Sequence, residues 1–203
     1  AKILMEDYKY KLLLIDADPT HPHLCKMLDL MPNKSLEEIR NELISNASRQ
    51  QYSNEEIAQK IDFRIYNSMA ETEKFCLLSI GQPEGPGCFC PSNTLLRNVI
   101  ESISQDFDLV LIDCEAGLEQ LNRKVLRTID MIIIVSDISM RSVETALAIQ
   151  KSAKKYTRYE NLGVIINKVK GNIQPIVTRL QEAGLPLYGQ ISEDPNITEM
   201  DMK

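Results

Sequence analysis

Short, continuous apolar runs alternate with helix-like patterns along most of the 203-residue chain. The apolar runs cover residues 12–15, 75–80, 109–112, 131–135 and 162–166, with a weaker run at 186–191. Runs that are continuous rather than alternating are typical of strands buried on both faces, as in parallel sheets. We therefore expect strands at these positions, most of them in a parallel sheet.

Apolar residues at helical spacing predict helices between the strands. Ser35 with Glu38, and Ser53 with Glu56, have the spacing of a capping box and predict two helix starts. Further helical patterns lie in residues 92–103, from residue 143 onward, and in residues 173–180 before Gly184 and Pro186.

This alternation predicts an α/β fold with a mainly parallel sheet and helices on both faces. No internal repeat, low-complexity tract or linker interrupts the pattern. We therefore expect a single domain over residues 1–203, with a helical insertion at about residues 32–74.

Composition and charge narrow the class of protein. The chain is 43% hydrophobic and 26% charged, as in ordinary globular domains. Its net charge of -6 argues against charge-driven binding of nucleic acid. No apolar run approaches the ~18 residues of a membrane span. The five cysteines are an odd number and no signal-peptide pattern is present, which favours a cytoplasmic protein without a disulfide scaffold. We expect neither a nucleic-acid partner nor a membrane partner.

Three of the predicted strands end in an aspartate: Asp16, Asp113 and Asp137. Ligands of open α/β sheets bind at the carboxyl ends of the strands, although an aspartate there can instead cap the next helix. Residues 109–113, four apolar residues and an acid, have the form of a Walker B strand, whose carboxylate holds Mg²⁺ through water. Gly117 follows four residues later, where a backbone N–H must approach a γ-phosphate without an intruding side chain.

Two carboxylates, Asp16 and Asp18, stand at alternate positions beyond the first strand. Such a pair can position a Mg²⁺-bound water and a lytic water beside a phosphate. The alternative is an Asx turn before Pro19, with no chemical role.

Cys88 and Cys90 lie two positions apart in a loop rich in glycine and proline. Two thiolates are half of a tetrahedral site for Zn²⁺, Ni²⁺ or Cu⁺, which two copies of the chain can complete across a two-fold axis. A redox pair and incidental loop cysteines remain alternatives.

The other cysteines and the histidines carry weaker signals. Cys25, Cys76 and Cys114 stand among apolar residues and are expected to pack in the core. His21 and His23 flank Pro22, where we favour a solvated loop over a metal site.

Four motifs occur in order along the chain: Asp16-Ala17-Asp18-Pro19, Gly85-Pro86-Gly87-Cys88-Phe89-Cys90, Asp113-Cys114-Glu115-Ala116-Gly117-Leu118-Glu119 and Asn167-Lys168. In this order they resemble the CooC-type accessory proteins, nickel-insertion ATPases that mature carbon monoxide dehydrogenase. These belong to the P-loop ATPases with a deviant Walker A motif, together with the cell-division and plasmid-partition ATPases. The resemblance runs from about residue 1 to residue 198.

The resemblance implies a role for each nucleotide-site residue. Asp16 would help organise Mg²⁺, and Asp18, in switch I, would orient the lytic water. Asp113 would hold Mg²⁺ from the Walker B strand, and Gly117 would sense the γ-phosphate of ATP. Asn167 would hydrogen-bond adenine.

The resemblance also implies a metal and two partners. Cys88 and Cys90 would bind Ni²⁺ or Zn²⁺ at the interface of a nucleotide-dependent homodimer, with carbon monoxide dehydrogenase as the client enzyme. Arg123 fits the Glu-x-x-x-Arg pattern that follows switch II in this family, but the pattern assigns it no role.

One element of the family is missing. A P-loop needs Gly-Lys-Ser or Gly-Lys-Thr, and none of the eight glycines stands in that context. Family members carry the loop before the residue that corresponds to Ala1, so residues 1–6 would be the tail of the P-loop helix. We therefore expect an N-terminally truncated P-loop domain without its first strand, whose parent is an ATPase that converts ATP to ADP and phosphate. Whether this chain is itself an enzyme stays open.

Three functions remain in competition. The first is an ATP-dependent metallochaperone that helps to insert nickel. The second is a partition-type or positioning-type scaffold ATPase, which would give the Cys-x-Cys loop no task. The third is a non-catalytic metal-binding module.

Overall fold

The computed structural model describes residues 2–7, 10–18, 23–47, 63–81, 100–114 and 128–197. They belong to two compact units, residues 1–116 and 117–203, each with its own sheet. Both units combine helices with mainly parallel strands, which confirms the predicted α/β fold. The prediction of a single domain stays a prediction.

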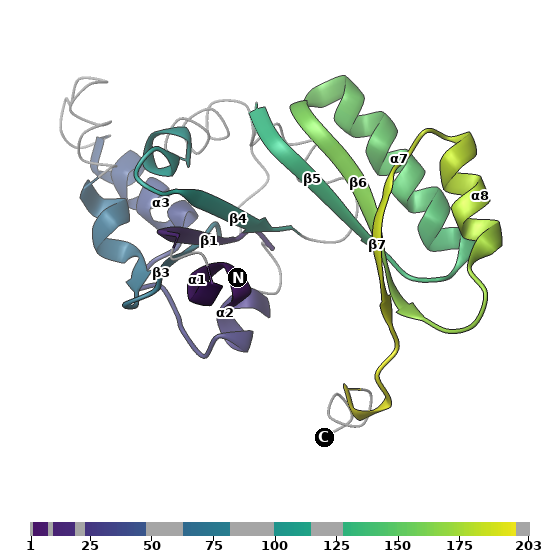
Figure 1. Ribbon diagram of the computed structural model, residues 1–203. Helices are drawn as coiled ribbons and strands as arrows, with labels where there is room; N and C mark the ends of the chain where they lie inside the picture. The colour runs from purple at the N-terminus through teal and green to yellow at the C-terminus, as the bar shows by residue number, and fades with distance from the viewer. Residues whose placement is uncertain are drawn as a thin grey trace. The chain divides into compact units, whose positions relative to one another are not determined.

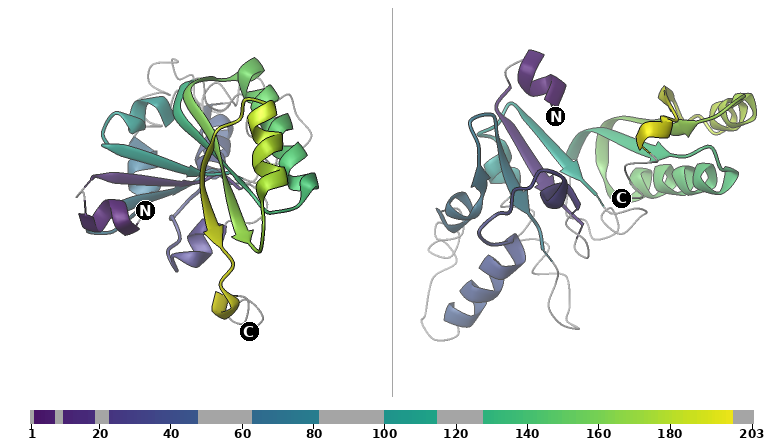
Figure 2. Two further views of the ribbon diagram at one scale, coloured as in Figure 1. Left: turned by 45° about the vertical axis from the view of Figure 1, so that its right-hand side comes forward. Right: turned by 90° about the horizontal axis from the view of Figure 1, so that it is seen from below.

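The sheet of the first unit has the strand order β2-β3-β1-β4. Strand β1 (Leu12–Asp16) runs parallel to β3 (Phe75–Ser79) on one side and to β4 (Leu109–Asp113) on the other. The two-residue strand β2 (Ala70–Glu71) pairs antiparallel with β3. Figures 1 and 2 show β1 in purple between β3 in blue and β4 in teal. The first apolar run of the sequence is thus the centre of this sheet.

Both faces of β1 are buried, which is why its sequence is continuously apolar. On one face Leu12 and Leu14 pack with Leu77 and with Cys25 of helix α2 (His23–Met27). Residues alternate between the faces of a strand, so Leu13 and Ile15 point to the other face, and neither has any exposed surface. The strand is therefore fixed in its register by a core on each side.

The first unit also contains the short helix α1 (Lys2–Asp7), helix α3 (Leu36–Ala47) and helical residues at 63–68 and 100–104. The predicted capping box at the start of α3 is confirmed. The Ser35 backbone N–H donates to Glu38 Oε2 at 2.7 Å, and the Glu38 N–H donates to Ser35 Oγ at 3.3 Å. The second predicted box, Ser53 with Glu56, lies outside the described residues. The expected insertion at 32–74 contains α3, the helical residues 63–68 and the strand β2.

The sheet of the second unit has three parallel strands in the order β5-β6-β7. They are β5 (Thr128–Ser136), β6 (Arg158–Val169) and β7 (Leu187–Ser192). Strands β5 and β6 extend beyond their predicted apolar runs because the backbone ladder continues through half-exposed residues such as Ile129 and Tyr159. Apolar runs therefore locate the buried centre of a strand rather than its ends.

Helices α7 (Met140–Tyr156) and α8 (Gln174–Glu182) pack on the same face of this sheet (Figure 1). Their core residues Val143 and Leu180 are almost completely buried with Val164 and Ile166 of β6. Gly184, with a φ of 62°, follows the end of α8, as predicted. No helix in the described part of the chain is long and apolar enough to cross a membrane.

The other face of this sheet exposes a row of large apolar side chains on β5. Met131, Ile133 and Val135 are 52%, 50% and 65% exposed, at alternate positions of the strand. Among the described residues of this unit, helices cover only the opposite face.

Candidate functional site

Strands β1 and β4 end side by side and bring two of the predicted carboxylates together. Asp16 and Asp113 are partners in the parallel register, and the N–H of the next residue, Ala17, donates to the Asp113 carbonyl oxygen at 2.8 Å. Asp18 follows two residues after Asp16. The candidate site is therefore the carboxyl edge of the first unit's sheet, where an open α/β sheet binds its ligands.

Asp16 is completely buried, and backbone N–H groups bind both of its carboxylate oxygens. The Asp18 N–H donates to Oδ1 at 3.2 Å and the Cys25 N–H donates to Oδ2 at 3.0 Å. Sequence reasoning missed Cys25 as a partner because a backbone donor leaves no signal in the residue type.

Asp113 stands in a crowded negative environment. Partial burial raises its pKa above the usual 3.8, and the negative charges of Asp16 and Asp18 raise it further. The charge of His23 on α2 acts in the opposite direction. A cluster of carboxylates that repel one another is an electrostatic environment that a cation stabilises.

Asp113 and Asp18 fit Mg²⁺ in the manner usual for phosphate-binding sites. No group of three or more histidines, cysteines or acidic residues in the described ranges is arranged to hold a metal ion alone. Mg²⁺ seldom needs such a cage, since it keeps several waters and takes one or two carboxylates together with substrate phosphates. Asp113, with Asp18 beside it, can supply that share.

The third strand-end aspartate, Asp137 in the second unit, has a structural role. Its Oδ1 accepts a hydrogen bond from the Ser139 N–H at 2.8 Å, and Ser139 is the N-cap of α7. These bonds to Ser139 hold the pKa of Asp137 below its usual value. Asp137 therefore supports the residue that caps α7, and Ser139 is itself the cap.

Asn167 lies near the carboxyl end of β6 in the second unit. Its side-chain oxygen accepts a hydrogen bond from the Lys168 N–H at 2.9 Å, and Lys168 has the left-handed φ of 55°. The amide NH₂ group of Asn167 is a hydrogen-bond donor, of the kind that a ring nitrogen can accept from.

The remaining predicted site residues, Cys88, Cys90, Gly117 and Arg123, lie outside the described residues, as does His21.

The thiols of the described cysteines have raised pKa values. Cys25 is buried and Cys76 is half-buried, as predicted, but Cys114 is exposed, because it follows the last residue of β4 beyond the core. Burial raises the pKa of the Cys25 thiol to about 12, with a contribution from Asp16. Local desolvation and the negative charge of Asp113 raise the pKa of the Cys114 thiol to about 11. Because only the thiolate binds metal well, the predicted metal site depends on Cys88 and Cys90.

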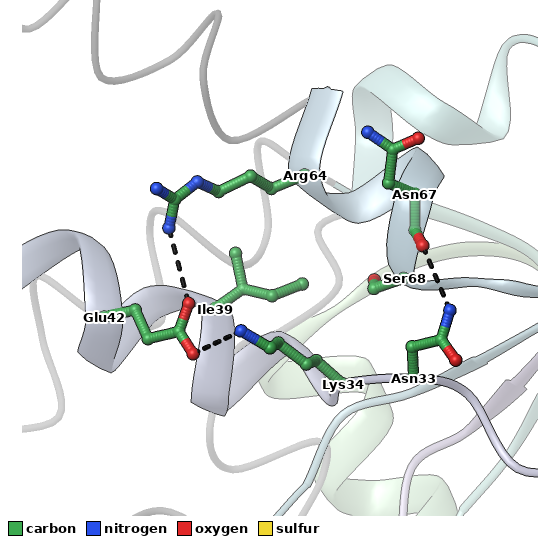
Figure 3. A pocket seen from close by; sticks show the side chains of 7 residues that line it. All are labelled: Asn33, Lys34, Ile39, Glu42, Arg64, Asn67 and Ser68. Atoms are coloured by element: carbon green, nitrogen blue, oxygen red, sulfur yellow. Dashed lines mark hydrogen bonds and ion pairs between the residues drawn. The ribbon is translucent and has the colours of Figure 1, made fainter.

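A cavity of about 320 Å³ lies elsewhere in the first unit, between α3 and the helical residues 63–68 (Figure 3). Glu42 stands at its edge and pairs with Lys34 at 2.5 Å and with Arg64 at 3.4 Å. All three side chains are about 40–50% exposed, so these pairs contribute little to stability. The cavity brings together one carboxylate and two cations, which is not a constellation for phosphate hydrolysis.

Comparison with known proteins places the chain in a family. The AAA-domain family matches residues 1–166. An uncharacterised ATP-binding protein of Methanocaldococcus jannaschii is 34% identical over 200 residues, covering 95% of this chain and 77% of the relative. The carbon monoxide dehydrogenase accessory protein CooC of Rhodospirillum rubrum is also 34% identical, but over 82 residues, or 40% of this chain and 31% of CooC.

Solved structures support the fold. An ATP complex of a McdA variant from Cyanothece has a TM-score of 0.67 and 17% identity, covering 98% of this chain and 77% of McdA. A ParA family ATPase from Chlorobium tepidum has a TM-score of 0.62 and 16% identity, covering 98% of this chain and 77% of the other. At these identities the likeness concerns the fold, which is that of the ParA and MinD P-loop ATPases.

Proposed function

The chain belongs to the AAA-domain family, and from this premise we propose that the protein is an ATPase of the ParA/MinD type. It binds ATP with Mg²⁺ and releases ADP and phosphate. One observation carries the proposal: Asp16, Asp18 and Asp113 converge at the adjoining carboxyl ends of β1 and β4.

Each residue has a distinct part in this proposal. Asp113 holds Mg²⁺, Asp16 helps to organise the ion's surroundings, and Asp18 orients the lytic water. The N–H of Gly117 senses the γ-phosphate and Asn167 hydrogen-bonds adenine. When bound, Mg²⁺ neutralises charge on the phosphates. Partial burial raises the pKa of Asp113, and repulsion from Asp16 and Asp18 raises it further. A cation would relieve that repulsion, which supports this assignment.

ATP hydrolysis by the full-length protein tests the proposal. We expect Asp18→Asn to lower kcat by roughly 10²–10⁴-fold, the usual contribution of a group that handles a proton in the transition state. Asp113→Asn should raise the Mg²⁺ concentration needed for half-maximal rate. Asp137→Asn is the matched control, since it changes a strand-end aspartate that binds the N–H of Ser139 in the other unit. No Mg²⁺-dependent hydrolysis by the wild type would refute the ATPase. Wild-type rates in both site variants would instead refute the roles of Asp18 and Asp113.

The finer function that we propose is that of a metallochaperone for nickel insertion. ATP would close a homodimer, the two Cys88–Cys90 loops would meet around Ni²⁺ or Zn²⁺, and hydrolysis would reset the dimer after transfer to carbon monoxide dehydrogenase. The partial likeness to CooC supports this function. The Cys-x-Cys motif and the Asp-x-Glu-Ala-Gly motif, which follow one another in this order along the sequence, support it as well.

A second candidate is a partition-type or positioning-type ATPase that binds a surface. It is favoured by four exposed cations, three in the last turns of α7 and one at the start of β6: Lys151, Lys154, Lys155 and Arg158. Among the ion pairs between described residues, none joins these cations to a carboxylate. ATP-dependent cosedimentation with DNA or lipid, abolished by Lys154→Glu with Lys155→Glu, would favour this function over metal delivery.

A further inference from the structure

We propose that Asp16 is a positioning residue, which fixes the place of Asp18 without itself touching the ion or the phosphate. This inference rests on the proposed ATPase and refines the role of one of its residues. It follows from where the oxygens of Asp16 are directed and from what already binds them.

The backbone of Asp16 is held in the middle of the sheet. Its carbonyl oxygen accepts a hydrogen bond from the Ile80 N–H at 2.9 Å, just beyond the end of β3. On the other side, Ala17 donates to the Asp113 carbonyl oxygen at 2.8 Å. The residue that carries the buried carboxylate therefore cannot shift without disturbing two neighbouring strands.

The carboxylate of Asp16 links the two ends of the segment between β1 and α2. One oxygen accepts from Asp18, two residues later, and the other accepts from Cys25, nine residues later. A buried carboxylate must keep such partners, and hydrogen bonds to an ionised acceptor are stronger than those between neutral groups. The same charge therefore holds the backbone of Asp18 and the first turn of α2 in one arrangement.

Burial separates the tasks of the two alternate aspartates. Asp16 has no exposed surface and both of its oxygens are bound by protein N–H groups, whereas Asp18 is partly exposed. Water, a cation or a phosphate can reach Asp18 and Asp113 but would have to displace backbone donors to reach Asp16. The Asp-x-Asp spacing thus places a buried positioning residue, Asp16, two residues before the accessible carboxylate of Asp18.

The test separates kcat from Mg²⁺ affinity in the full-length protein. Asp16→Asn replaces one acceptor oxygen by an NH₂ group, which faces a backbone N–H and cannot accept from it. We expect kcat to fall about 10–100-fold, as for other residues that position a functional residue without themselves touching the metal or substrate. The apparent KM for ATP and the apparent Mg²⁺ constant should stay within about twofold of wild type, and excess Mg²⁺ should not restore the rate.

Other outcomes overturn the proposal in distinguishable ways. A Mg²⁺ constant raised about tenfold or more, with rescue by excess Mg²⁺, would make Asp16 a direct ligand. An unchanged kcat per folded molecule, with a lowered Tm, would make it a purely structural core residue. Asp137→Asn, which alters a similar bond to the second following residue in the other unit, is the control for both measurements.

A second variant keeps the proposal testable if Asp16→Asn does not fold. Cys25→Pro deletes one of the two donors while the carboxylate remains, and the first turn of a helix tolerates a missing N–H. We expect kcat to fall in the same direction by a smaller factor, with the Mg²⁺ constant unchanged. An unaltered kcat would overturn the positioning role. Absence of ATPase activity in the wild type would instead defeat the proposed function itself.

Discussion

Two strand-end aspartates, Asp113 and Asp137, carry the same group in opposite electrostatic surroundings. Partial burial, with Asp16 and Asp18, raises the pKa of Asp113, whereas bonds from Ser139 lower that of Asp137. The contribution of Asp113 to the free energy of unfolding is fully present below 3.8, the ordinary pKa of an aspartate. It is lost as the pH rises through the raised pKa of Asp113 in the folded protein. The contribution of Asp137 to the free energy of unfolding is present above 3.8. It is lost as the pH falls through the lowered pKa of Asp137.

Melting curves recorded from about pH 3 to about pH 7 test these two opposite pH dependences, because this range includes the ordinary pKa of an aspartate. The Tm of Asp113→Asn should rise relative to wild type as pH increases above 3.8. The Tm of Asp137→Asn should approach that of wild type as pH decreases below 3.8. Parallel pH dependence of the two variants would mean that the carboxylates near Asp113 do not interact as the structure shows.

Gly163 in β6 is required by a neighbouring aromatic ring. A Cβ at this position would lie 2.4–2.5 Å from ring atoms of Tyr188 in β7. Gly163→Ala should therefore lower the free energy of unfolding by about 1–3 kcal/mol, the usual cost of overpacking. Gly189→Ala is the matched control, because a Cβ there meets nothing within 4 Å. Equal losses in a urea titration of the two variants would show that the Tyr188 ring moves aside freely.

At the scale of elements, the capping box determines where α3 begins. Ser35 and Glu38 exchange hydrogen bonds there, and bonds from Ser35 lower the pKa of Glu38. Ser35→Ala should cost about 0.5–2 kcal/mol at neutral pH, as for other lost N-caps. The difference should shrink as pH falls below the ordinary value of 4.5, since stability linked to a lowered pKa is lost on protonation.

The control for the capping box is Ser102→Ala, which alters an exposed serine within the helical residues 100–104. Its effect should stay within about 0.5 kcal/mol, as for most surface substitutions. Thermal and urea unfolding at neutral and acidic pH measure both variants. A Ser35→Ala effect that is independent of pH would separate the cap from the ionisation of Glu38.

The elements also show which parts of the fold sequence reasoning could reach. Apolar runs located the centres of the strands because burial on both faces requires them, and the Ser-x-x-Glu pair located a helix start. The order β3-β1-β4 was not predictable, because pairing depends on distant segments. Asp16 and Asp113 were recognisable as strand ends, but their adjacency in the register was not. The bond from Cys25 to Asp16 could not be foreseen, since any residue except proline carries the same N–H.

At the scale of the whole molecule, metal binding should depend on two chains and two loops. A tetrahedral sulfur site needs four thiolates, so Cys88 and Cys90 of two copies would hold about one ion per pair of chains. The described cysteines do not compete well, since the thiols of Cys25, Cys76 and Cys114 have raised pKa values. This contrast makes metal stoichiometry a direct measure of the chaperone proposal.

We expect the full-length protein with Cys88→Ser and Cys90→Ser to lose bound Ni²⁺ or Zn²⁺, measured by elemental analysis of the purified dimer. Cys76→Ala removes a half-buried thiol of β3 and should leave the stoichiometry unchanged. ATP hydrolysis should persist in the double variant, because the carboxylates of β1 and β4 are intact. Unchanged metal content would refute the metallochaperone and leave the surface-binding ATPase. Metal binding by a wild type without ATPase activity would favour a non-catalytic metal-binding module.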